Sequence, residues 1–184
     1  MSSTRLEKKE YPAVGESVYQ TTLQNGLKLY LIPKDDFNET YAMISTKFGS
    51  VDTCFTIGPS KDKKEYPAGI AHFLEHKLFE DKDGKDYLQH FVRLGSESNA
   101  FTSFTQTSYL FSTTSNVSEN LRLLLEMIQT LHLSEGSLEK ERLIIQQEIE
   151  MYQDNPDYQL FFRALANLYP NTPLSQDIAG SVPS

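Results

Sequence analysis

The chain has 184 residues, of which 39% are hydrophobic and 11% aromatic, so we expect one domain over residues 1–184 with an ordinary core. A formal net charge of −8 excludes the basic surface that nucleic-acid partners require. No apolar run approaches the roughly 18 residues of a membrane span or forms a signal segment, so a cytoplasmic protein without a membrane partner is expected. The polar start predicts a loose terminus over residues 1–17.

A β-hairpin is the first predicted element. Residues 18–23 (VYQTTL) and 27–32 (LKLYLI) are rich in β-branched and aromatic side chains. Between them, Asn25-Gly26 supplies the positive φ angles of a tight turn.

Two more strands are predicted over residues 41–48 (YAMISTKF) and 51–57 (VDTCFTI), and we expect them to pair with each other. The second contains Cys54, the only cysteine, so no intramolecular disulfide can form and a reduced, half-buried thiol is expected. The charged residues 61–65 (KDKKE) predict an exposed loop.

The pattern then changes to helical spacing. Residues 69–79 (GIAHFLEHKLF) predict a mostly buried helix that nevertheless carries two histidines, and residues 87–94 predict a second, short helix. Residues 99–114 contain many Thr, Phe and Tyr without breakers, which predicts one long or bent strand.

Three helices are predicted to follow. Ser118 is a suitable N-cap for the first and Ser137 for the second, which is expected to run to the Asn155-Pro156 break, and residues 160–169 form the third. The order of elements predicts an α+β fold, with a mainly antiparallel sheet and helices packed on one face.

A metal site is indicated by three residues of the first helix. His72 and His76 are four positions apart, so their imidazoles project from one face and can bind one ion. Glu75 lies on nearly the same face, where its carboxylate could take a proton from water at the metal. The order H-x-x-E-H is that of the inverzincin metallopeptidases.

A catalytic zinc needs a third protein ligand, for which Glu148 is the candidate. Glu141 and Glu148 lie seven apart on one face of a predicted helix, and apolar neighbours such as Ile145 and Ile149 indicate burial, which is costly for an unpaired carboxylate. The spacing alone favours a solvated acidic face over a ligand, and Glu139 and Glu150 are assigned to that face.

Three motifs in this order resemble the insulinase/pitrilysin family of zinc peptidases, which includes the mitochondrial processing peptidases. They are GIAHFLEHKLFE, GSESNAFTSFTQTSYLF and EKERLIIQQEIE, within a match from about Gly26 to Gly180. The form FLEHKLFE is closer to a bacterial subgroup, and Lys77 stands where the common form often has Met.

The resemblance implies roles for these residues. It makes His72, His76 and Glu148 the Zn²⁺ ligands and Glu75 the general base of peptide hydrolysis. Glu141 would orient a ligating histidine, and its removal should weaken the site without abolishing metal binding. Asn99 and Ala100 match an edge strand that pairs with an extended peptide substrate, although an ordinary edge strand explains them equally well.

Family members resemble a clamshell of two homologous halves, so residues 1–184 are expected to be an N-terminal fragment of a catalytic half. Activity would then need the second half or a partner subunit, and the fragment alone would cleave peptides poorly. The competing hypotheses are a non-catalytic interaction subunit, whose relatives usually lose the motif, and a zinc hydrolase of small molecules, which the substrate-strand motif disfavours.

Overall fold

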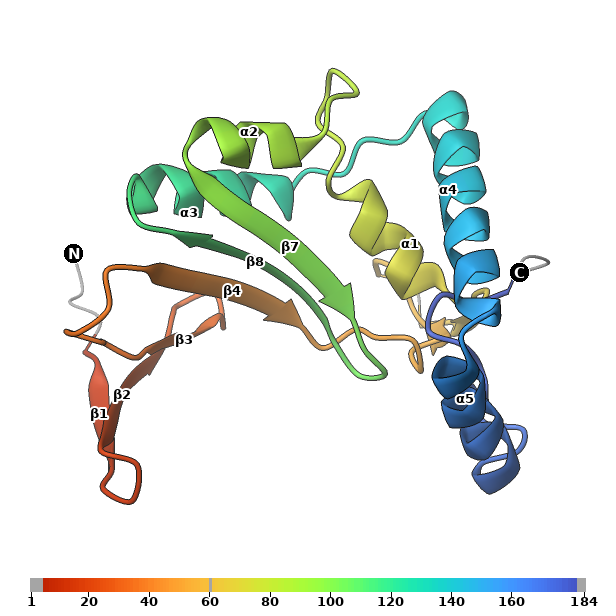
Figure 1. Cartoon of the computed structure of the whole chain (residues 1–184), viewed down its shortest axis with the longest axis horizontal. Coiled ribbons are helices and arrows are strands. Elements are labelled where there is room, and N and C mark those ends of the chain that lie inside the picture. The colour runs from red at the N-terminus through yellow and green to blue at the C-terminus, as the bar shows by residue number, and fades with distance from the viewer. Residues whose placement is uncertain (1–4, 60, 182–184) are drawn as a thin grey trace. The chain divides into compact units, whose positions relative to one another are not determined.

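The computed structural model describes residues 5–59 and 61–181 (Figure 1). The chain divides into two compact units, Met1–Asn38 and Glu39–Ser184. The expectation of one domain over residues 1–184 stays a prediction. None of the helices in the described ranges is long and apolar enough to cross a membrane.

The first unit is a three-stranded antiparallel meander of β1 (Glu7–Tyr11), β2 (Glu16–Thr22) and β3 (Lys28–Leu31). The predicted hairpin is confirmed, but only Gly26 has a positive φ, whereas Asn25 accepts a hydrogen bond from the Leu27 amide through its side chain.

The loose terminus predicted for residues 1–17 is wrong from Glu7 onward. The register Glu7 opposite Gln20 through Tyr11 opposite Glu16 orders this segment as a strand. Its side chains are all exposed, so backbone ladder hydrogen bonds rather than apolar burial hold it. Residues 1–4 lie outside the described residues.

The second unit is built on an antiparallel sheet with the order β4 (Thr40–Thr46), β8 (Thr107–Thr113), β7 (Ser96–Thr102). The prediction of one strand over residues 99–114 is wrong, because β7 and β8 form a hairpin. A backbone hydrogen bond from Ser103 N to Gln106 O closes its turn without the Gly or Pro that would mark it in the sequence.

The expected pairing of residues 41–48 with 51–57 is also wrong. β4 pairs with β8, whereas β5 (Cys54–Phe55) pairs with β6 (Lys64–Glu65) inside the predicted charged loop. In this two-stranded ribbon Cys54 is exposed rather than half-buried.

Helices α1 (Ile70–Lys77), α2 (Tyr87–Arg93) and α3 (Val117–Met127) lie on the same side of this sheet (Figure 1). The two predicted helices at 69–79 and 87–94 are thus confirmed. Aromatic and aliphatic side chains of α2, α3 and β8 form the buried core: Tyr87, Phe91, Tyr109, Phe111, Leu124 and Met127. The α+β class, with helices on one face of an antiparallel sheet, is confirmed.

Helix α4 (Glu135–Gln153) packs against α1 and is followed by α5 (Pro156–Leu168) and a short 3₁₀ turn, Pro173–Ser175. The caps differ from those predicted. Ser134, not Ser137, caps α4 by accepting from the Ser137 amide, and α3 begins after Asn116 rather than at Ser118. The break at Asn155-Pro156 is confirmed, and the Asn155 side chain caps α5.

Candidate metal centre

Helix α1 carries three of the predicted site residues. It begins after Gly69, whose φ of +85° favours glycine and whose Cβ, if present, would lie 2.4 Å from the Ala179 carbonyl oxygen. The helix contacts both β7 and α4, so His72 and Glu75 are each only 8% exposed. Polar side chains on a buried helix face require partners, and those partners come from α4 and β7.

The two histidines and Glu148 converge between α1 and α4. His72 Nε2 lies 3.8 Å from Glu148 Oε1, and His76 Nε2 lies 3.5 Å from Glu148 Oε2. One ligand atom from each of the three residues lies within 4.8 Å of the others, an arrangement that could hold a metal ion. Two imidazole nitrogens and one carboxylate are a donor set typical of catalytic zinc.

Glu141 contacts the outer side of one histidine. Its Oε1 lies 3.0 Å from His76 Nδ1. The hydrogen bond from His76 lowers the pKa of Glu141, so the carboxylate accepts and His76 Nδ1 donates. This fixes the tautomer that leaves the lone pair of His76 Nε2 facing Glu148.

The pKa values of the two histidines are shifted in opposite directions. Burial, reinforced by the nearby His76, lowers the pKa of His72 to about 4, so its imidazole is neutral at physiological pH. Burial also acts to lower the pKa of His76, but its hydrogen bond and charge attraction to Glu141, with Glu148 and Glu75, outweigh that effect and leave the pKa raised. Within the described residues, His72 Nδ1 is buried without a hydrogen-bond partner.

Glu75 lies close enough to His76 and Glu148 for their charges to affect its pKa, and it also contacts the β7–β8 hairpin. Thr102, the last residue of β7, donates a hydrogen bond to Glu75 Oε2. Burial raises the pKa of Glu75, although this hydrogen bond opposes the shift. The raised pKa suits a carboxyl that takes and returns a proton near neutral pH.

Asn99 and Ala100 lie in the middle of β7. Within the described parts of the chain, β7 pairs with β8 alone and so forms an edge of its sheet. The Asn99 side chain is exposed and accepts from the Ala100 amide. The strand therefore offers an unpaired edge and contacts α1.

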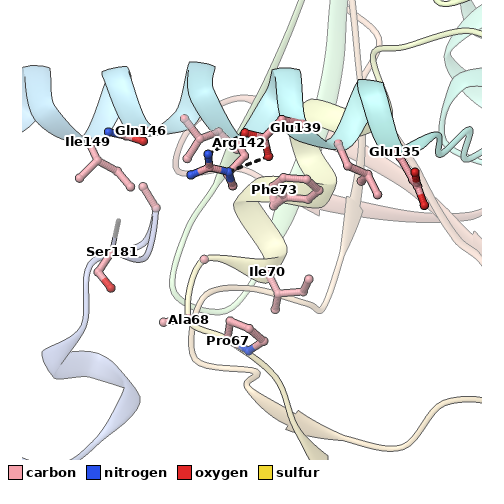
Figure 2. Close-up of a pocket in the computed structure, with 14 residues that line it drawn as sticks. Pro67, Ala68, Ile70, Phe73, Glu135, Glu139, Arg142, Gln146, Ile149 and Ser181 are labelled. Carbon is pink, nitrogen blue, oxygen red and sulfur yellow. Dashed lines mark hydrogen bonds and ion pairs between the residues drawn. The ribbon is translucent and has the colours of Figure 1, made fainter. Parts of the chain in front are cut away.

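A separate apolar cavity of about 490 Å³ lies beside these residues, between α1, α4 and residues 179–181 (Figure 2). Its lining includes Phe73, Ile145 and Ile149, with an ion pair between Arg142 and Glu139 at its edge. The two histidines do not line this cavity. The α1–α4 interface therefore has a polar part around the histidines and an apolar part that contains the cavity.

Sequence reasoning missed some of the partners of the site. Thr102 lies within residues 99–114, which the sequence predicts as one strand, and nothing in the sequence marks it as the neighbour of Glu75. Lys77, which is fully buried, did give a signal, because a lysine within a predicted buried helix needs a partner.

The fold and site define a metallopeptidase-like chain, and comparison with known proteins identifies the family. The family described as Insulinase (Peptidase family M16) matches residues 42–182, so the chain belongs to that family, as the motifs predicted. A Bacillus subtilis (strain 168) protein named "Uncharacterized zinc protease YmfH" is 49% identical over 95% of this chain and 41% of its own length.

Solved structures agree with this assignment. A candidate M16-like peptidase from Alicyclobacillus acidocaldarius is 40% identical with a TM-score of 0.85, covering 95% of this chain and 40% of that one. A protease from Helicobacter pylori is 26% identical with a TM-score of 0.74, covering 98% and 39%. The chain thus spans about two fifths of the length of the proteins that it matches.

Proposed function

We propose that this chain carries the zinc site of a metalloendopeptidase, with His72, His76 and Glu148 as ligands and Glu75 as general base. The observation that carries the proposal is the meeting of the two α1 histidines with Glu148, which is 72 positions away from His76 in the sequence. Glu141 is proposed to orient His76 through the hydrogen bond to Nδ1.

Zinc, when bound, would polarise the scissile carbonyl and make a water molecule acidic enough to react. Glu75 accepts that proton. Its Oε2 is held by Thr102, which leaves Oε1 to take the proton and later deliver it to the leaving amine. Burial favours the protonated intermediate state of Glu75, in line with its raised pKa.

The substrate is proposed to be a peptide in extended form. Its backbone would add to the free edge of β7 at Asn99 and Ala100, a mode in which main-chain hydrogen bonds give affinity without strict sequence preference. That edge lies on the same hairpin as Thr102, so a bound peptide would approach the general base.

Cleavage is proposed to require more than these residues. The chain covers 41% of the Bacillus relative, so a second homologous half or a partner subunit is expected to complete the substrate chamber. The isolated chain would then bind zinc and show little activity. The cytoplasmic location expected from the sequence stays a prediction.

The test is zinc content after purification without added metal. Wild type is expected to hold one zinc, Glu148→Gln to lose it, and Glu75→Gln to keep it, while the assembled peptidase carrying Glu75→Gln should lose hydrolysis. Glu150→Gln is the matched control, because Glu150 lies on the same helix but is exposed and accepts a hydrogen bond from Gln146. Wild type without zinc, or Glu148→Gln with a full complement, would favour a non-catalytic interaction subunit instead.

A further inference from the structure

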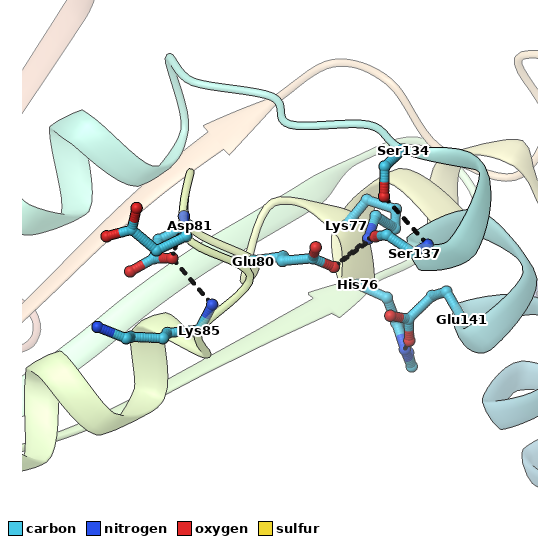
Figure 3. Close-up of polar contacts among 9 residues, drawn as sticks. His76, Lys77, Glu80, Asp81, Lys85, Ser134, Ser137 and Glu141 are labelled. Atoms are coloured by element: carbon cyan, nitrogen blue, oxygen red, sulfur yellow. Dashed lines mark hydrogen bonds and ion pairs between the residues drawn. The ribbon is translucent and has the colours of Figure 1, made fainter.

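A buried lysine links the two helices of the metal centre. Lys77 follows His76 directly and its side chain is 0% exposed. Its Nζ donates to Ser137 Oγ on α4 and pairs with the Glu80 carboxylate, while Ser137 Oγ donates to Glu80 Oε2 at 2.6 Å (Figure 3). The three groups thus form a closed hydrogen-bonded network.

The network of Lys77, Glu80 and Ser137 adjoins the contacts that α4 makes with the two histidines of α1. Ser137, Glu141 and Glu148 are spaced by four and seven residues, so they share one stripe of α4. Along that stripe, Ser137 meets Lys77, Glu141 meets His76 at 3.0 Å, and Glu148 meets both histidines. A small rotation of α4 about its axis would break all of these contacts together.

Apolar packing constrains that rotation only in part. On the adjoining face of α4, Ile145 and Ile149 are buried, but they also line the 490 Å³ cavity (Figure 2). A loosely packed interface leaves a helix several near-equivalent orientations, whereas a hydrogen-bonded network specifies one.

The lysine is also poorly explained by stability alone. Burying an ammonium group is costly, and Ser137 lies in the first turn of α4, where the helix dipole disfavours a positive charge. A methionine of similar length would avoid both costs.

We infer that Lys77 is a positioning residue: with Glu80 and Ser137 it clamps α4 in the rotation that brings Glu141 and Glu148 to the histidines. This inference rests on the zinc site proposed above. Lys77 hydrogen-bonds to Glu80 and Ser137 rather than to the ligand Glu148 or to Glu141, so it acts through the placement of α4 and has no part in the chemical step.

The experiment compares Lys77→Met with wild type. Zinc affinity, measured by competition with a chelator, should fall roughly tenfold, at the lower end of the range for residues that orient ligands. The visible spectrum of the cobalt-substituted protein should change, because the ligand geometry is altered. Stability of the metal-free protein to urea should not fall. Lys82→Met, at an exposed lysine on the following turn, should leave all three unchanged.

Ser137→Ala provides a second variant that removes only a hydroxyl. It should reduce zinc affinity in the same direction, and the double variant Lys77→Met/Ser137→Ala should lose no more than Lys77→Met alone, because both act through one network. Amide hydrogen exchange along α4 in the metal-free protein should be faster in both variants.

Contrary results separate the two proposals. Wild-type zinc affinity and cobalt spectrum in Lys77→Met, or additive losses in the double variant, would overturn the clamp while leaving the zinc site intact. If wild type itself binds no zinc, the proposed function fails, and the exchange measurement still decides the clamp: unchanged protection of α4 in Lys77→Met would refute it.

Discussion

Two neighbouring regions of the second unit bury side chains of opposite character, apolar in one and polar in the other. Under α2 and α3, the buried side chains are aromatic and aliphatic, and Phe91, Phe111 and Leu124 are fully inaccessible to solvent. Between α1 and α4, the buried side chains are instead His72, Glu75 and Lys77. The first region gains free energy from removing apolar surface from water, whereas the second spends free energy to hold polar groups in fixed positions.

The comparison teaches where stability and chemistry reside. The buried cluster of the core consists of aromatic and aliphatic side chains. The α1–α4 interface satisfies nearly every buried polar atom with a partner and leaves an apolar cavity beside them. Tyr109 lies at the boundary, packed in the core yet close enough for the Glu75 charge to add to the burial that raises the pKa of its phenol.

The largest expected effect is in the core. Phe91→Ala should lower the free energy of unfolding by about 3–5 kcal/mol, because it leaves a cavity in a fully buried cluster. Urea denaturation measures this. Val92→Ala is the adjacent control at a 70% exposed side chain and should change stability by less than about 0.5 kcal/mol. Equal losses of unfolding free energy in Phe91→Ala and Val92→Ala would show that Phe91 is not part of the stabilising core.

The next effect concerns the polar interface. Glu141→Gln should weaken zinc binding about 10- to 100-fold, because the carboxylate that accepts from His76 Nδ1 is lost. Unfolding of the metal-free protein should change far less than in Phe91→Ala. Glu139→Gln, two residues away and paired with Arg142 on the exposed side, is the control and should bind zinc as wild type does.

A smaller effect is expected at the hairpin. Thr102→Val keeps the shape of the side chain but removes the hydroxyl that holds Glu75 Oε2. In the assembled peptidase, kcat should fall severalfold while zinc content and KM stay near those of wild type. A rise in KM with unchanged kcat would instead assign Thr102 to peptide binding.

The smallest effect is expected in the turn before α2. Backbone hydrogen bonding from Lys85, with the His90 side chain, lowers the pKa of Asp81 to about 2 from its ordinary 3.8. A lowered folded-state pKa contributes stability that is present above the unfolded value and lost as pH falls toward about 2. The Tm of Asp81→Asn should therefore lie below that of wild type at pH 7, and the gap should close between about pH 4 and pH 2.

Local patterns allowed much of the site to be predicted from sequence. The spacing of His72, Glu75 and His76 places them on one helix face whatever the rest of the chain does, because the geometry of a helical turn is set by neighbouring residues. The break before α5 and the Gly26 turn were predictable for the same reason.

Contacts between distant segments were decided only by the tertiary structure. The sequence left Glu148 either a ligand or part of a solvated face, and the packing of α4 on α1 brought it to the histidines. The same holds for β4, which pairs with β8 over its nearer neighbour, and for Thr102 beside Glu75. Such pairings depend on how the whole chain closes around its core, a cooperative outcome that no short stretch of residues encodes.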